Sequence, residues 1–232
     1  MKRSFLWILF SSSFLLVNCG DVTAIEDGKK YGPVIAIQDW FTSCHLLKAG
    51  KEIVLFDACW REGTLQAGLE KHGIKPDQVT HVLLTHGHAD HVGGLGILKN
   101  AKIWALPEEQ AVITEHAGSK GQIDRKLKDG ELLKFGQFEV KVMGVKGHTA
   151  GSAVYLVNGT LILGDSALIN SKGLLVPAPE DRSENPALLI KSLIALDQRL
   201  KKEKHTIKWL LPAHSAGIAE QTALSDFAKK NK

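Results

Sequence analysis

The feature that most constrains this chain is a cluster of four side chains of metal-binding type within six residues: His86, His88, Asp90 and His91. The cluster begins where a β-rich segment, residues 79–85, ends and a helix is expected to follow. His86 and His88 are two positions apart, so in extended backbone they point to the same side. Asp90 and His91 come after the chain turns, so they face the same space from another direction. Imidazole and carboxylate groups are good zinc donors. A polar surface turn would explain neither the spacing nor the strand-to-helix context, so the sequence predicts a metal site at this turn.

The rest of the chain is predicted to begin with a meander of strands and then to alternate strands with helices. Strands are expected at residues 34–38, 43–47, 53–57, 79–85, 102–106, 132–134, 138–145, 153–157, 160–163 and 207–211. Helices are expected at residues 63–71, 92–98, 107–116 and 186–200, and after the last strand. Asn185 is the expected N-cap of the fourth helix, and Pro177 and Pro179 mark a loop. This order favours an α/β fold with helices outside packed sheets.

The turn at residues 85–91 resembles the His-x-His-x-Asp-His signature of the metallo-β-lactamase superfamily. Three later segments are similar to the motifs that follow it in that family: residues 147–152 with His148, residues 163–165 with Asp165, and residues 212–214 with His214. Upstream, Phe56-Asp57 resembles an early structural Asp of the family. The resemblance therefore covers most of the chain.

This resemblance implies a four-layer αββα sandwich that holds two divalent metal ions. The first ion would be bound by His86, His88 and His148. The second would be bound by Asp90, His91 and His214, with Asp165 between both ions. Asp90 is also implied as the catalytic acceptor of the water proton. A donor set of histidines and aspartates favours zinc.

Two such ions lower the pKa of a shared water to about 7 and polarise a substrate oxygen, which predicts hydrolysis by hydroxide attack. Glyoxalase II proteins share the ligand set but add a C-terminal helical region, whereas 18 residues follow His214 here. We therefore expect a small ester, thioester or lactone as substrate. Hydrolysis of β-lactams in the envelope is the alternative. A non-catalytic metal-binding lipoprotein is a further alternative, which the complete ligand set disfavours. A diiron redox relative is less expected, because such proteins usually carry Glu at the position of His88.

The motifs also depart from the family pattern. Lys146 precedes Gly147 where Pro is usual, Ala150 replaces a frequent Pro, and Ala213 and Ser215 stand where Gly is common. These changes alter loop stiffness rather than ligand identity, so they affect the substrate assignment more than the metal assignment.

Several other residues near the motifs have two interpretations. Asp57 and Thr149 are candidates to orient ligand histidines, with a cap or turn bond as an equal alternative. Trp40 and Trp60 are candidates for the mouth of the site, although core or surface packing is the commoner role. Five histidines match no motif and are expected on the surface or in packing: His45, His72, His81, His116 and His205.

The first 18 residues have the pattern of an export signal. Lys2 and Arg3 precede an apolar run at residues 5–17, which is too short for a membrane span and typical of a signal peptide. The run ends before Cys19 in a sequence that resembles a bacterial lipobox, with Asn18 in place of the usual small residue. We expect residues 1–18 to be the signal peptide, residues 19–33 a short tether and residues 34–232 the catalytic domain. The protein would then be exported to the periplasm and attached to the membrane through a lipid on Cys19. Ordinary cleavage that leaves a soluble periplasmic or secreted protein is the alternative.

The two remaining cysteines, Cys44 and Cys59, would be able to form a bridge in an oxidising compartment. The predicted hairpin around Ala49-Gly50, however, places residue 44 opposite residue 55 rather than 59. We therefore expect two separate cysteines.

The net charge of +4 does not predict a nucleic-acid partner, because the basic residues are scattered. The two densest groups, residues 201–204 and 229–232, are interpreted as solvated helix faces. The expected partner is therefore a small-molecule substrate.

Overall fold

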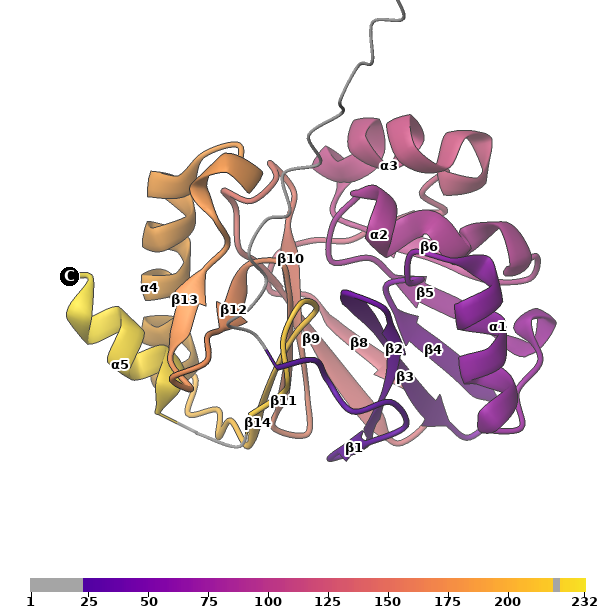
Figure 1. Cartoon of the computed structure of the whole chain (residues 1–232), viewed down its shortest axis with the longest axis horizontal. Helices are drawn as coiled ribbons and strands as arrows, with labels where there is room; N and C mark the ends of the chain where they lie inside the picture. The colour runs from indigo at the N-terminus through magenta and orange to yellow at the C-terminus, as the bar shows by residue number, and fades with distance from the viewer. Residues whose placement is uncertain (1–22, 219–221) are drawn as a thin grey trace, which may run out of the picture.

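Two β-sheets packed face to face form the middle of the fold, and helices cover their outer sides (Figure 1). The computed structural model describes residues 23–218 and 222–232. The first sheet contains, in order, β1 (Lys30–Tyr31), β2 (Val34–Asp39), β3 (Thr42–Ala49), β4 (Glu52–Phe56), β5 (His81–Leu83), β6 (Lys102–Ala105) and β7 (Arg125–Lys126). The second contains, in order, β14 (Trp209–Pro212), β11 (Thr160–Gly164), β10 (Ala153–Val157), β9 (Phe138–Gly144) and β8 (Leu132–Phe135).

Apolar side chains fill three spaces between four layers. Phe56 and Leu83 of the first sheet are buried in one cluster with Val140 and Tyr155 of the second. The outer face of the first sheet is covered by α1 (Glu62–Lys71), α2 (Ala89–Val92) and α3 (Gln110–Ala117). The outer face of the second sheet is covered by α4 (Pro186–Lys202) and α5 (Ala223–Lys230). Leucines at every third or fourth position of α1 and α4 supply the buried stripes of these helices. The predicted αββα sandwich is therefore confirmed.

Strand direction explains where polar residues collect. β4, β5, β6 and β7 run parallel to one another, and β11 runs parallel to β14. Carboxyl ends of parallel strands meet at one edge of a sheet, and loops at that edge carry most functional side chains in such folds. Asp57, His86, Asp165 and His214 each lie one to three residues beyond the end of one of these strands.

Some elements differ from the prediction. The folded region begins before residue 34, because β1 pairs with β2, and Ile25 and Tyr31 are buried in the core. The second half of the predicted tether is therefore part of the domain. Residues 1–22, which include the predicted signal peptide and Cys19, lie outside the described residues. The expected loop at Pro177 is the end of a short hairpin, β12 (Ala167–Ile169) and β13 (Leu175–Pro177). The helix expected at residues 92–98 is a 3-10 helix, Gly93–Ile97, after the single turn of α2.

No helix in the described part of the chain is long and apolar enough to cross a membrane.

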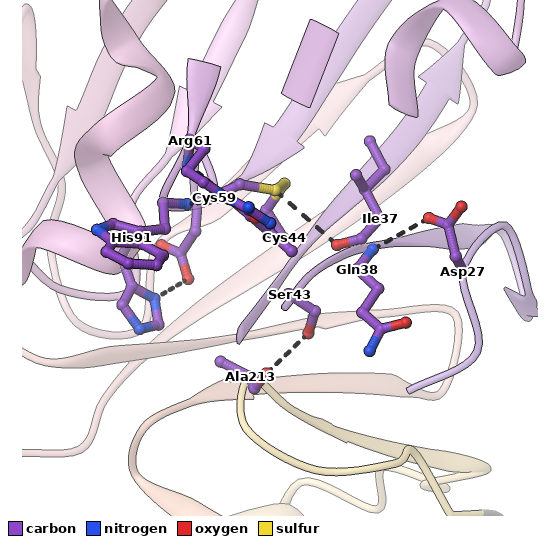
Figure 2. Close-up of a disulfide and its surroundings, with 12 residues drawn as sticks. Asp27, Ile37, Gln38, Ser43, Cys44, Cys59, Arg61, His91 and Ala213 are labelled. Atoms are coloured by element: carbon purple, nitrogen blue, oxygen red, sulfur yellow. Dashed lines mark hydrogen bonds and ion pairs between the residues drawn. A yellow bond between two sulfur atoms is a disulfide. The ribbon is translucent and has the colours of Figure 1, made fainter. Parts of the chain in front are cut away.

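Cys44 and Cys59 form a disulfide with a Cα–Cα distance of 5.0 Å, so the expectation of two separate cysteines is wrong (Figure 2). In the observed register Leu46 pairs with Leu55, which places residue 44 beyond the end of β4. The chain then turns sharply, with positive φ angles of 62° at Asp57 and 55° at Cys59. This left-handed turn, which is uncommon outside glycine, carries Cys59 back beside Cys44.

Candidate metal centre

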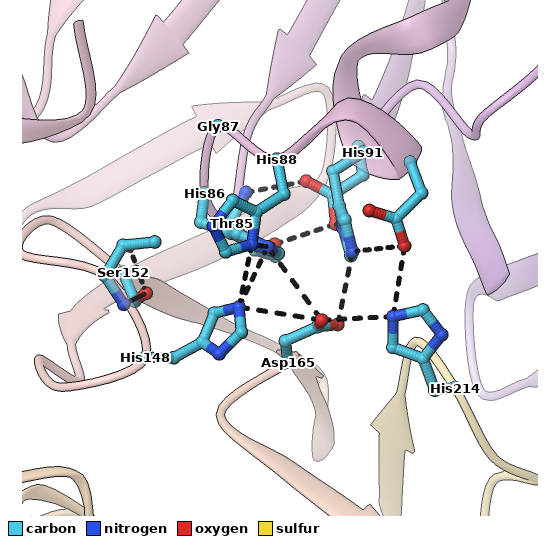
Figure 3. A network of polar contacts seen from close by, with 12 residues as sticks. Thr85, His86, Gly87, His88, His91, His148, Ser152, Asp165 and His214 are labelled. Carbon is cyan, nitrogen blue, oxygen red and sulfur yellow. Dashed lines mark hydrogen bonds and ion pairs between the residues drawn. The ribbon is translucent and has the colours of Figure 1, made fainter. Parts of the chain in front are cut away.

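The first group of converging side chains comes from two loops. His86 and His88 lie in the turn between β5 and α2, and His148 lies in the turn between β9 and β10. His88 Nδ1 lies 3.0 Å from His86 Nε2 and 3.0 Å from His148 Nε2. His86 Nε2 and His148 Nε2 are 3.2 Å apart, so the three nitrogens form a nearly equilateral triangle (Figure 3). Three neutral imidazoles whose nitrogens face one another in this way offer lone pairs to one common point.

The second group lies on the other side of Asp165. His214 Nε2 is 3.1 Å from Asp90 Oδ2 and 3.0 Å from Asp165 Oδ2. His91 Nε2 is 3.1 Å from Asp165 Oδ1. Asp165 Oδ2 is also 3.6 Å from His148 Nε2, so this carboxylate faces both groups (Figure 3). The structure therefore brings together all seven side chains that the sequence singled out, in the two sets predicted, with Asp165 between them.

Glycines at positive φ allow the backbone to deliver two of these side chains. Gly147 has φ 128° and precedes His148, and a Cβ on it would lie 2.3 Å from the backbone nitrogen of Leu189. Gly164 has φ 52° and precedes Asp165, and a Cβ there would lie 2.5 Å from Thr85 Oγ1. No other residue fits these two contacts, so the loops approach their neighbours as closely as the chain permits.

Burial and charge set the protonation of the two groups differently. Burial lowers the pKa of His86 well below its usual value and that of His148 to about 4, so both imidazoles are neutral at pH 7. Burial also opposes a charge on His91 and His214, but the nearby carboxylates outweigh it. Asp165 and its neighbours raise the pKa of His91 well above its usual range and that of His214 to about 10. In this arrangement protonated histidines compensate the aspartates, a role that a divalent cation also fulfils.

The donor set fits a pair of metal ions. His91 Nε2 and Asp165 Oδ1 are buried and make no hydrogen bond of good geometry among the described residues, although they lie 3.1 Å apart, which leaves both atoms available to a metal ion. A tetrahedral zinc site with bonds of about 2.0–2.1 Å has nitrogen ligands roughly 3.3 Å apart, close to the edges of the histidine triangle.

Asp57 orients one of the predicted ligands. Its Oδ2 accepts a hydrogen bond of 2.8 Å from His91 Nδ1, which leaves His91 Nε2 directed toward Asp165. Its Oδ1 and Oδ2 also accept bonds from the backbone nitrogen and hydroxyl of Thr85, at 2.7 and 2.8 Å. Thr149, the other candidate, contacts no ligand histidine through its hydroxyl and instead donates to Glu109 Oε1 at 2.6 Å.

Glu109 was missed by the sequence reasoning. Its side chain is fully buried and binds both loops that carry the histidine triangle. The sequence places it beside Glu108 at the start of a predicted helix, where acidic residues are usually exposed. Nothing in the local pattern distinguishes the two glutamates.

An aromatic group lies beside the second set. Phe41 stacks on His214 with ring centroids 5.6 Å apart, and its carbonyl accepts a bond of 2.8 Å from His214 Nδ1. Trp40 and Trp60 stack on each other at 5.6 Å and pack against Phe41. The exposed fractions of Trp40, Phe41 and Trp60 are 67%, 42% and 36%, so these rings offer an apolar surface next to the metal centre.

Comparison with known proteins agrees with this arrangement. The family model of the metallo-beta-lactamase superfamily matches residues 37–214. The human mitochondrial persulfide dioxygenase ETHE1 is 31% identical over 129 residues, which cover 54% of this chain and 47% of that protein. Hydroxyacylglutathione hydrolase of Anaeromyxobacter dehalogenans is 31% identical over 144 residues, which cover 61% of this chain and 49% of that protein. The chain thus spans about half the length of these relatives.

Solved structures share the fold at low sequence identity. A metallo-beta-lactamase from Pontibacter korlensis superimposes with a TM-score of 0.68 at 18% identity, covering 89% of this chain and 98% of that one. A flavo di-iron protein mutant from Thermotoga maritima gives a TM-score of 0.65 at 21% identity, covering 82% of this chain and 52% of that one.

Proposed function

Because this chain belongs to the metallo-β-lactamase superfamily, we propose that it is a two-metal hydrolase that cleaves a small ester, thioester or lactone. The observation that carries this proposal is the division of seven converging ligands into two sets with Asp165 between them. His86, His88 and His148 would hold the first ion. Asp90, His91 and His214 would hold the second. The donor types favour zinc in both positions.

When bound, two such ions activate a water molecule and polarise the carbonyl oxygen of a substrate. The chain's own residues prepare this chemistry. Burial keeps His86 and His148 neutral, which is the form that coordinates a metal. Asp57 fixes the tautomer of His91 by accepting the proton of its Nδ1. Asp90 is partly open to solvent. Burial raises its pKa, but His91 and His214 lower the pKa by more, so Asp90 is ionised at pH 7. As a carboxylate it would accept the proton of the attacking water.

Two features support an acyl substrate with an apolar part. The exposed rings of Trp40, Phe41 and Trp60 adjoin the metal centre and suit an apolar or planar group. One relative is, by name, a hydrolase of acylated glutathione, which supports thioester chemistry. The likeness to a β-lactamase concerns the fold and leaves β-lactam hydrolysis as an alternative for the assay.

A second candidate comes from the persulfide dioxygenase relative. An iron dioxygenase needs one redox-active ion held by histidines and a carboxylate, and His86, His148 and Asp165 would supply such a set. The number and kind of metal separate the two candidates. A hydrolase binds two zinc ions per chain, whereas the dioxygenase binds one iron and consumes oxygen.

The test measures metal content and then turnover on a panel. The purified protein is assayed with a chromogenic ester, an acyl-glutathione thioester, a short lactone, the β-lactam nitrocefin, and glutathione persulfide with an oxygen electrode. We expect two zinc ions and turnover of at least one ester, thioester or lactone, abolished in Asp165→Asn and retained in the control His205→Ala. Turnover of nitrocefin alone would favour the β-lactamase alternative. Two ions without turnover on any substrate would favour a non-catalytic metal-binding protein and refute the proposal.

We further propose that the protein is exported and attached to the membrane through a lipid on Cys19. The buried disulfide between Cys44 and Cys59 supports export, because disulfides persist in oxidising compartments. Cell fractionation of the full chain and of Cys19→Ala tests this. We expect the wild type in the membrane fraction and the variant in a soluble fraction, and a wild type that stays in the cytoplasm would contradict it.

A further inference from the structure

One buried carboxylate joins the two loops that carry the histidine triangle. Glu109 Oε2 accepts a hydrogen bond of 2.8 Å from the backbone nitrogen of Gly87, which lies between His86 and His88. Glu109 Oε1 accepts a bond of 2.7 Å from the backbone nitrogen of Gly151 and one of 2.6 Å from Thr149 Oγ1. Each oxygen therefore binds a different metal-ligand loop.

Both backbone contacts need glycine. A Cβ on Gly151 would lie 2.9 Å from Glu109 Oε1, and a Cβ on Gly87 would lie 2.5 Å from the backbone nitrogen of Ile113 in α3. Contacts this short are not tolerated between a Cβ and a backbone or bound polar atom. The two loops consequently pack against Glu109 and α3 at the closest approach that a polypeptide permits, which fixes their separation.

Burying this carboxylate is expensive for the fold. The side chain of Glu109 is fully buried, and burial raises its pKa despite three hydrogen bonds to it. Its hydrogen-bond partners among the described residues are two backbone N–H groups and one hydroxyl, none of which carries a positive charge. A buried charge without an opposite charge destabilises a protein relative to a well-packed apolar residue. The neighbouring Glu108, in contrast, is exposed and pairs with Lys146.

The second ligand set is supported by a different carboxylate. Asp57 binds His91 directly, and the adjoining backbone of Ala58 accepts and donates bonds to residues 91–94. Asp57 forms no hydrogen bond with Gly87, Thr149 or Gly151. Asp57 also binds Thr85, the residue before His86, so it contacts both halves of the metal centre. The hydrogen bonds of Glu109, in contrast, go only to Gly87, Thr149 and Gly151, in the two loops of the first half.

We propose that Glu109 is a positioning residue for the first metal ion and not for the second. It holds the His86/His88 loop and the His148 loop at the separation that the first ion requires. This inference rests on the proposed function, because it assumes that the three histidines bind a metal. It predicts that loss of Glu109 weakens the first site selectively.

The test uses backgrounds in which one site remains. His214→Ala leaves the first site, and His148→Ala leaves the second, so zinc affinity can be titrated for each site alone. Glu109→Gln keeps the size of the side chain but places an amide donor against a backbone N–H group. We expect Glu109→Gln to weaken zinc binding about 10- to 100-fold in the first background, as the loss of a ligand-orienting partner typically does, and to leave the second background unchanged.

Two further variants separate positioning from general damage. Glu115→Gln makes the same change at an exposed position of α3 and should alter neither site. Thr149→Val removes one of the three hydrogen bonds to Glu109, and we expect a smaller loss confined to the first site. It also serves if Glu109→Gln does not fold.

The outcomes distinguish this inference from the proposed function. Equal zinc affinity of Glu109→Gln and its parent in the first background would overturn the inference, and so would an equal loss in both backgrounds. A wild-type chain that binds no zinc, iron, manganese or cobalt would instead overturn the proposed function, since the inference then has no metal site to act on.

Discussion

Reduction of the Cys44–Cys59 disulfide should destabilise the domain by an amount that follows from its place in the chain. The two cysteines are separated by 15 residues, and closing a loop of that length in the unfolded chain is worth about 3 kcal/mol. Both side chains are fully buried, so the reduced thiols stay in the same packed environment, and the chain entropy of the unfolded state accounts for most of the change. For a domain of this size each kcal/mol shifts the melting temperature by about 2–4 °C. We therefore expect reduction to lower the melting temperature by about 6–12 °C.

The assay compares oxidised and reduced wild-type protein by calorimetry, with EDTA present so that metal binding does not contribute. Thiols are counted in denaturant before and after reduction, and the count should rise by two. The double variant Cys44→Ala/Cys59→Ala controls for the reductant and should melt near the reduced wild type, with no further change on reduction. An unchanged thiol count would refute the disulfide itself. A rise of two thiols with a melting shift below about 1 °C would refute the chain-entropy reasoning.

Three further predictions concern other parts of the fold and the mouth of the site. His45 is buried with no hydrogen-bond partner in the part of the chain that the structure describes, and burial lowers its pKa to about 3. The unfolded state therefore binds the extra proton below pH 6.5, and stability falls as the pH drops. Between pH 7.5 and 5 this histidine should lower the free energy of unfolding by about 2 kcal/mol. His45→Leu should abolish that loss in urea unfolding at the two pH values, and an unchanged dependence of the unfolding free energy on pH would contradict this. Trp40→Ala/Trp60→Ala should raise KM for an aromatic acyl substrate about 2- to 10-fold with little change in kcat, whereas Leu132→Ala, on the exposed start of β8, should not. Gly147→Ala should destabilise the domain by about 2–3 kcal/mol, because the new Cβ would meet Leu189. Gly173→Ala, which has a positive φ but open space around it, should cost about 1–2 kcal/mol, and equal losses in the two variants would show that the contact with Leu189 is unimportant.

The sequence predicted the alternation of strands and helices through its periodicities and the cluster at residues 86–91 through its spacing, whereas the four-layer sandwich and the roles of His148, Asp165 and His214 came from the resemblance to the metallo-β-lactamase superfamily. Alternating and helical periodicities report which face of an element is buried, and α1 and α4 were located by their leucines for that reason. His86, His88, Asp90 and His91 lie in one short turn, and the other predicted ligands each follow the end of a strand. Because these strand ends meet at one edge of the sheets, the fold that the resemblance implies brings the residues together.

The tertiary structure alone decided the contacts that depend on register and on the approach of distant segments. A shift of two residues in the pairing of β3 with β4, followed by left-handed backbone at Asp57 and Cys59, turned two apparently separate cysteines into a disulfide. Glu109 and Glu108 look alike in the chain, and only the packing of α3 against the loops at Gly87 and Gly151 buries one and leaves the other in solvent. Such contacts join residues 15 to 42 positions apart, and their geometry is set by the whole packed core rather than by any local pattern.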